Sequence, residues 1–128
     1  MSCGSHSSIM ADVADRTFLI VAGPDVLRCG RGLNHLGWEG WGTHDPKLAE
    51  VLVDERAYDL ALIEARYAEV VHVARAKDPG LPVILLVDSD DDAQRGLARL
   101  GDVHVDAIVR WQDPPEVVTK TAQQIVRP

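Results

Sequence analysis

Three nearly unbroken apolar runs limit the fold of this chain more than any other feature of the sequence. They lie in the segments 17–22, 58–64 and 82–87, and the second of them ends on a single acid, Glu64. Apolar runs of this length without polar alternation are typical of strands buried on both faces, which belong to parallel sheets covered by helices. The sequence therefore predicts an α/β protein in which Glu64 lies at the carboxyl edge of the sheet.

Helical patterns separate these runs from one another and from two weaker strand candidates. The weaker candidates are 38–43, which is rich in glycine and suits an edge, and 105–110. Five strands then alternate with five helices, an order that implies right-handed crossovers and a parallel sheet. We expect one three-layer α/β/α sandwich, in which Leu62, Ile84 and Ile108 are fully buried.

Two of the expected helices carry clear start signals. One begins at Asp45-Pro46, with Asp45 as its N-cap, and is expected to bury Leu48, Val51 and Leu52. The last helix is expected to begin with Asp113 as its N-cap. An earlier helical face over 26–36 is formed by Val26, Leu27, Gly30, Leu33 and Leu36.

The composition sets the class of protein. A chain of 128 residues suits one domain, which we expect over 16–128 after a flexible tail over 1–15. A net charge of −7 argues against binding to a nucleic-acid backbone. The sequence has no apolar run near the ~20 residues of a membrane span, and its start lacks the apolar segment of a signal peptide. Two cysteines, Cys3 and Cys29, make no disulfide framework, so the expected location is the cytoplasm.

The order and length of these elements, together with the stretches FLIVAGPDV, YDLALIE and LPVILLVDSDD, resemble a receiver domain of bacterial response regulators. The resemblance covers almost the whole chain, from about Arg16 to Arg127. It implies a CheY-like, flavodoxin-like sheet of strand order 2-1-3-4-5. It also implies a functional edge at the carboxyl ends of the strands.

A working receiver binds Mg²⁺ with an acid pair and accepts a phosphoryl group on an aspartate. It holds that group with a hydroxyl and a lysine, and an aromatic residue reports the phosphorylated state. By the resemblance, these positions are occupied here by Ala22 and Gly23, Glu64, Val87, Arg110 and Ala107, respectively. The metal ligands and the hydroxyl are therefore missing, and phosphoryl transfer depends on such groups for positioning and charge neutralisation. The resemblance thus implies an atypical, phosphorylation-independent pseudo-receiver that is not an enzyme and has no cofactor.

Two charged clusters leave alternatives open at this edge. Glu64 and Arg110 could pair across the site, either as a mimic of the activated state or, in the favoured interpretation, as a structural ion pair. Asp25 and Asp88 are weak candidates for a metal site near Glu64. The favoured interpretation of the acids after Asp88 is that they stabilise a helix N-terminus capped by Ser89 or Asp90.

Three functional hypotheses follow from the sequence. The first is a signalling domain that binds a protein partner through its fourth and fifth helices and fifth strand, with Trp111 and Val117 as candidate interface residues. A homodimer is a further open alternative. The second is a sensor that takes a small molecule or an anion in the degenerate pocket. The third is a conventional phosphorylated receiver with substituted site residues.

Overall fold

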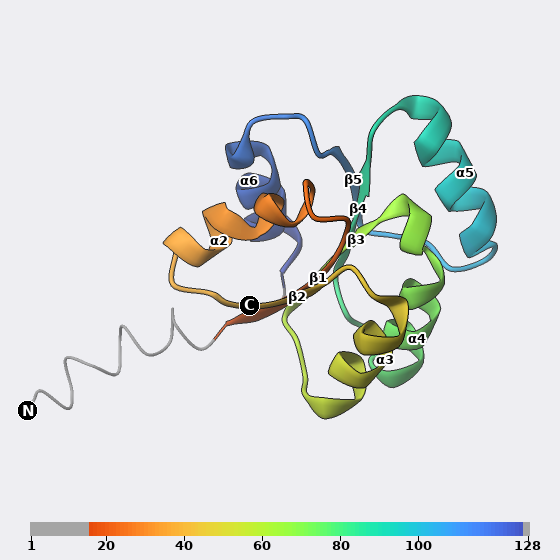
Figure 1. The fold of residues 1–128 in the computed structure, drawn as a ribbon, viewed down its shortest axis with the longest axis horizontal. Coiled ribbons are helices and arrows are strands. Elements are labelled where there is room, and N and C mark those ends of the chain that lie inside the picture. Colours follow the sequence, from red (N-terminus) through yellow and green to blue (C-terminus); the bar gives the residue numbers. More distant parts are fainter. Residues whose placement is uncertain (1–15, 127–128) are drawn as a thin grey trace, which may run out of the picture.

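The computed structural model describes residues 16–126, so the tail expected over 1–15 lies outside the described residues. Five parallel strands form one sheet in the order β2-β1-β3-β4-β5, which confirms the predicted strand order (Figure 1). The strands are β1 (Thr17–Val21), β2 (Glu39–Thr43), β3 (Leu60–Glu64), β4 (Val83–Val87) and β5 (Ala107–Arg110).

Helices cover both faces of this sheet and complete the predicted three layers. The α-helices are α2 (Arg31–His35), α3 (Pro46–Glu55), α4 (Glu69–Lys77), α5 (Asp90–Leu100) and α6 (Pro115–Ile125). Two short 3-10 segments follow β1 and β3, namely η1 (Leu27–Gly30) and η2 (Ala65–Tyr67). Figure 1 shows α2 and α6 on one face of the sheet and α3, α4 and α5 on the other. Within residues 16–126, no helix is long and apolar enough to cross a membrane.

The core consists of one layer on each face of the sheet. Alternate strand residues point to opposite faces, so Leu62 and Ile84 pack on the α2 and α6 side, and Ile63 packs on the α3 and α4 side. Leu62 and Ile84 are both 0% exposed, as predicted. This double burial explains why β3 and β4 are apolar without alternation.

Helix α3 buries a different stripe from the one that the sequence predicts. Asp45 caps it, because its carboxylate accepts a hydrogen bond from the Lys47 N–H. However, Leu48 and Val51 are exposed and Leu52 is half-buried, whereas Ala49 and Val53 are buried. Residues four apart lie on one helix stripe, and here the stripe of smaller side chains faces α4 and the sheet. The prediction of the buried face was therefore wrong.

The prediction that Ile108 is fully buried was also wrong, because its side chain is 43% exposed. Ile108 lies on the edge strand β5 and pairs in register with Leu85 of β4. Helix α5 packs over β4 and η2 rather than over β5. Ile108 therefore lies beyond the cover of α5, at the edge of the sheet.

Two of the predicted helices also differ from the structure, one in its continuity and one in its N-cap. The segment 26–36 divides into η1 and the short α2. Gly30 lies at the junction, where a Cβ would overlap the ring of Phe18, so close packing on β1 favours a glycine that weakens a regular helix. Helix α6 begins after Pro114 without a side-chain cap, so Asp113 is not its N-cap.

Candidate functional site

The carboxyl edge of the sheet brings together the residues that end its three adjacent strands β3, β4 and β5. Glu64 ends β3, Val87 ends β4 and Arg110 ends β5. Val87 lies directly beside Arg110 in the register, and Glu64 lies beside Leu86. The predicted gathering of these three positions at one edge is therefore confirmed.

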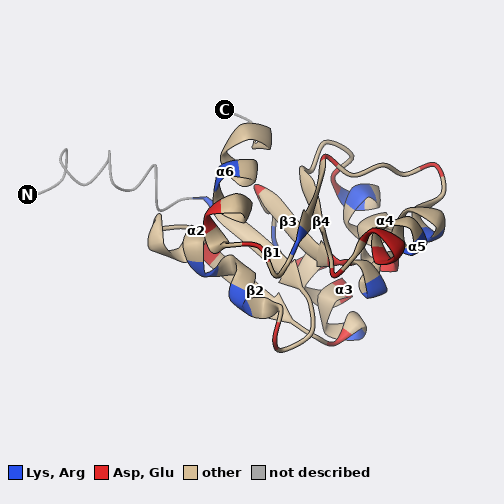
Figure 2. Ribbon diagram, turned by 90° about the horizontal axis from the view of Figure 1, so that it is seen from above, with Lys and Arg blue, Asp and Glu red and all other residues tan. Residues whose placement is uncertain are grey.

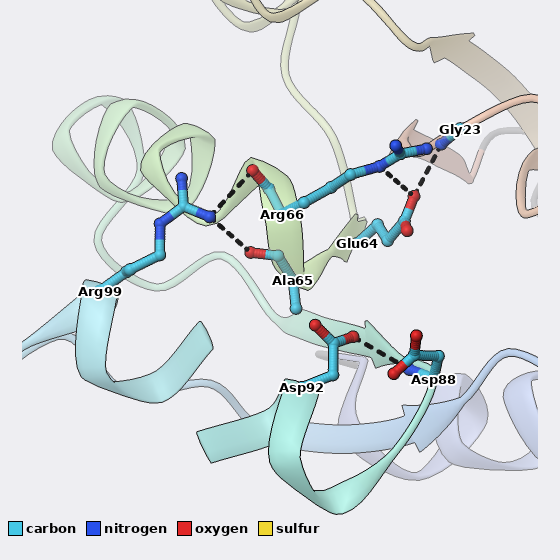
Figure 3. Close-up of polar contacts among 7 residues, drawn as sticks. All are labelled: Gly23, Glu64, Ala65, Arg66, Asp88, Asp92 and Arg99. Atoms are coloured by element: carbon cyan, nitrogen blue, oxygen red, sulfur yellow. Dashed lines mark hydrogen bonds and ion pairs between the residues drawn. The ribbon is translucent and has the colours of Figure 1, made fainter. Parts of the chain in front are cut away.

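Glu64 is held by two donors on the same oxygen. Its Oε1 accepts a hydrogen bond from the Gly23 N–H at 2.8 Å and one from the Arg66 Nε–H at 3.2 Å (Figure 3). The Glu64 side chain is only 13% exposed, whereas that of Arg66 is 58% exposed. The carboxylate is thus oriented and neutralised from within the chain, by a backbone amide after β1 and by a guanidinium two residues further on.

Arg66 lies across Gly23, at one of the positions that the resemblance assigns to the acid pair. A Cβ on Gly23 would overlap the Nη2 of Arg66, so the guanidinium fills the space beside the glycine backbone. The cation is also 5.2 Å from the centre of the Tyr67 ring, within the range of a cation–π contact. Sequence reasoning missed Arg66, although a basic residue two positions after a strand-end acid was a visible signal.

The pair between Glu64 and Arg110 that the sequence suggested does not form. Arg110 instead contacts Asp90 at the start of α5, with 3.0 Å between Nη2 and Oδ1. Strand β4 separates β3 from β5, so the two side chains begin about 10 Å apart, two strand spacings of ~4.8 Å. Arg66 and Asp90 are nearer partners for the two charges.

The rest of this edge offers little to a phosphoryl group or a metal. Val87 is buried among Ala65 and Leu85, and Ala107 packs against the core on the opposite face. Asp25 and Asp88 are exposed. Among residues 16–126 no group of three or more His, Cys, Asp or Glu side chains is placed to hold a metal ion. Divalent cations such as Mg²⁺ prefer carboxylate oxygens, so the residues around Gly23 do not fit the metal site of a working receiver.

The acids after β4 organise the start of α5. Ser89 caps the helix by accepting a hydrogen bond from the Asp92 N–H, and the Asp92 carboxylate accepts one from the Asp88 N–H at 3.0 Å. Asp90, Asp91 and Asp92 form an acidic first turn, which the helix dipole favours (Figure 2). The structure therefore agrees with the helix-start interpretation of this cluster.

Arg99 connects α5 to the segment that follows Glu64. It forms an ion pair with Glu69. Its Nη1 also donates to the backbone oxygens of Ala65 and Arg66, as Figure 3 shows. Gly96 allows the close approach, since a Cβ there would lie 3.0 Å from the Cβ of Ala65. The position of α5 is therefore tied to the backbone of the same segment that carries Arg66.

The candidate interface residues Trp111 and Val117 lie half-buried after β5 and in α6. The backbone oxygen of Trp111 accepts a weak contact from the Cys29 thiol at 3.8 Å. Burial raises the pKa of the Cys29 thiol, with a smaller contribution of the same sign from Glu64, while Arg28 opposes the shift. A cavity of about 370 Å³ lies beside these groups and is lined by Arg28, Arg31, Trp111 and Pro114, among others.

Comparison with known proteins identifies the architecture but no sequence relative. No family model matches the chain, and no curated protein sequence matches it. Solved structures do match. The receiver domain of a sensor histidine kinase from Pseudomonas aeruginosa PAO1, with a magnesium ion in its active-site cleft, superposes with a TM-score of 0.72 at 16% identity. This match covers 86% of this chain and 96% of that one.

Two response-regulator structures are similar to the same degree. One is a response regulator of Thermotoga maritima in complex with Mg²⁺ and BeF, with a TM-score of 0.71, 17% identity, and coverage of 87% of this chain and 99% of that one. The other is the chemotaxis protein CheY4 of Vibrio cholerae, with a TM-score of 0.70, 19% identity, and coverage of 87% and 98%. Together with the strand order, these matches show that the chain has the CheY-like, flavodoxin-like receiver fold of response regulators.

Proposed function

We propose that this chain is a receiver-like signalling domain that acts without phosphorylation, through contact with a protein partner in a two-component-type pathway in the cytoplasm. The observation that carries the proposal is the network at Glu64, in which one carboxylate oxygen, Oε1, accepts hydrogen bonds from the Gly23 N–H and from Arg66. A phosphoryl acceptor needs a free carboxylate, a cation to neutralise the incoming charge and donors for the transferred group. Here Val87 supplies no donor, and the chain is not expected to be an enzyme.

The partner surface that we propose consists of α5, β5 and α6. Leu97 of α5 is 39% exposed and Ile108 of β5 is 43% exposed, and both are large apolar side chains. Trp111 follows β5 and Val117 lies in the first turn of α6, so they border the same β5 edge from the opposite face of the sheet. Exposed apolar patches rimmed by polar residues are typical of interaction sites in soluble proteins, and the proposal is that these side chains contribute to one such patch. A signal would then be carried by the shape of this surface.

A photo-crosslinking amino acid placed at position 108 or at position 97 tests this surface in cells of the source organism. We expect both positions to capture the same protein, because both side chains point away from the core. Position 51 is the matched control, since Val51 is 47% exposed but lies on α3. The substitution Ile108→Asp is expected to weaken the captured partner's binding about ten-fold or more, the effect of losing one well-buried contact.

The same crosslinking experiment also tests whether the surface works without phosphate at Glu64. Glu64→Gln removes the charge at the acceptor position and is expected to leave the crosslink at position 108 almost unchanged. Equal capture of the same protein at position 51, or loss of the crosslink in Glu64→Gln, would count against a surface that works without phosphate.

The second candidate function is a sensor of a small molecule or an anion. The argument for it is the cavity of about 370 Å³ beside Arg28, Arg31 and Trp111, which combines cations with an aromatic ring. The argument against it is that Arg66 fills the space beside Gly23 in the degenerate pocket itself. The cavity lies on the α6 side of the sheet, so a ligand bound there would not occupy the degenerate pocket beside Gly23 and Glu64.

A further inference from the structure

We propose that Arg66 is the resident cation of the degenerate pocket, a side chain of the chain itself in the place where a receiver of this fold would bind a divalent metal. This inference rests on the proposed absence of phosphorylation and adds a residue and a mechanism to it. Gly23 and Arg66 act as a matched pair, because the missing side chain of one makes room for the guanidinium of the other.

The first support is steric. The guanidinium lies so close to Gly23 that any Cβ at this position would overlap Nη2. The same hypothetical Cβ would lie 3.5 Å from the Oε1 of Glu64, so a side chain at position 23 would begin next to both members of this ion pair. Because Nη2 is the far end of a flexible side chain that is 58% exposed, an acid at position 23 would displace the guanidinium from its present place.

The second support is electrostatic. Glu64 is 13% exposed, and a carboxylate at this depth is costly unless a cation or several donors stabilise it. Arg66 supplies the positive charge and one hydrogen bond at 3.2 Å, and the Gly23 N–H supplies the second hydrogen bond at 2.8 Å. Arg66 and the Gly23 N–H thus give Glu64 the charge neutralisation and the contacts that a metal ion would otherwise provide.

The third support is the anchoring of the segment that carries Arg66. The backbone oxygens of Ala65 and Arg66 accept hydrogen bonds from Arg99 of α5. Figure 3 shows the Arg66 side chain extending from this anchored backbone toward Gly23, away from Arg99. The guanidinium is therefore directed at Glu64 by a backbone that is fixed from the other side.

The inference predicts that a divalent-cation site can be restored only by changing both partners. Mn²⁺ is a suitable probe because it takes the same oxygen ligands as Mg²⁺ and broadens nearby NMR signals. The double variant Gly23→Asp with Arg66→Ala presents two carboxylates and no guanidinium. We expect it to bind Mn²⁺ with broadening of the amide signals around positions 23 and 64. We expect more than about ten-fold tighter binding than for Gly23→Asp alone, because a fixed charge ~4 Å away strongly opposes a second cation.

A matched control tests whether the position of the arginine matters or only the loss of one positive charge. Arg110 lies at the same edge of the sheet and is 52% exposed, close to the 58% of Arg66, but it pairs with Asp90. Gly23→Asp combined with Arg110→Ala has the same net charge as the double variant. We expect it to bind Mn²⁺ no better than Gly23→Asp alone. Equal restoration by the Arg110 variant would overturn the assignment of Arg66.

A simpler measurement keeps the inference testable if the double variant does not fold. In Arg66→Ala the amide signal of Gly23 should shift, since its acceptor Glu64 has lost the cation, while Arg110→Ala should leave that signal in place. An unchanged Gly23 signal in Arg66→Ala would overturn the inference. Mn²⁺ binding beside Glu64 in the unaltered protein would also contradict the proposed function, whereas tight binding by Gly23→Asp with Arg66 present would contradict only the role of Arg66.

Discussion

Replacing Ile84 by alanine is expected to lower the free energy of unfolding by about 2–5 kcal/mol, the usual range for a large side chain removed from a core. Ile84 lies in β4, is 0% exposed and pairs in register with Leu62 of β3 and Ala107 of β5. Its side chain packs into the core layer under α2 and α6. The cavity left by the substitution would lie between the sheet and the helices α2 and α6 that cover this face.

Chemical denaturation of the variant and of a matched control measures this effect. Ile108→Ala removes the same atoms from the next strand, but Ile108 is 43% exposed, so the expected loss is below about 1 kcal/mol. Similar losses for the two variants would mean that β4 is not the central, doubly covered strand.

Replacing Arg75 by alanine is expected to cost about 2–3 kcal/mol, a range set by the partners it leaves unsatisfied. The Arg75 side chain is 14% exposed and donates to the Leu81 oxygen at 2.8 Å, the His104 oxygen at 3.1 Å and the Asp106 carboxylate at 2.9 Å. Asp106 also accepts from the Val83 N–H at 2.8 Å. One arginine on α4 thus fixes the segments that lead into β4 and β5. Because Asp106 is 36% exposed, solvent reduces the cost of leaving its charge unpaired.

Two further variants define what Arg75 contributes. Arg75→Lys keeps the charge but loses the planar set of donors, so it is expected to restore only part of the lost stability. Arg95→Ala is the surface control, since Arg95 is 68% exposed and lies 3.7 Å from Asp92, and its expected cost is below about 1 kcal/mol. A denaturation midpoint for Arg75→Ala equal to that of Arg95→Ala would show that the three contacts do not hold α4 to the sheet.

The sequence was sufficient to predict the elements and their order, because the doubly buried strands β1, β3 and β4 are unbroken apolar runs that helices separate. It was not sufficient to predict which residues of a helix face inward. In α3, Leu48, Val51 and Leu52 form one apolar face, but the stripe that packs against α4 and the sheet is that of Ala49 and Val53. The exposure of Ile108 likewise depends on the lateral position of α5, which no pattern in β5 records.

The candidate site was predictable in its place but not in its contacts. Strand order brought Glu64, Val87 and Arg110 to one edge, since each ends a parallel strand. The ion pairs depend on which side chains can reach each other across the edge, and sequence reasoning paired Glu64 with Arg110 without allowing for the intervening strand. Arg66 was missed because its importance comes from the space over Gly23, which only the folded chain defines.

The intact mass of the protein after incubation with a small-molecule phosphodonor and Mg²⁺ tests the central claim most directly. A receiver of known activity serves as the positive control for the donor. We expect the mass of this protein to remain unchanged, because Oε1 of Glu64 is engaged by the Gly23 N–H and Arg66. In addition, the positions that the resemblance assigns to the acid pair and the hydroxyl are Ala22, Gly23 and Val87. A gain of one phosphoryl group that disappears in Glu64→Gln would contradict the account and restore a conventional phosphorylated receiver.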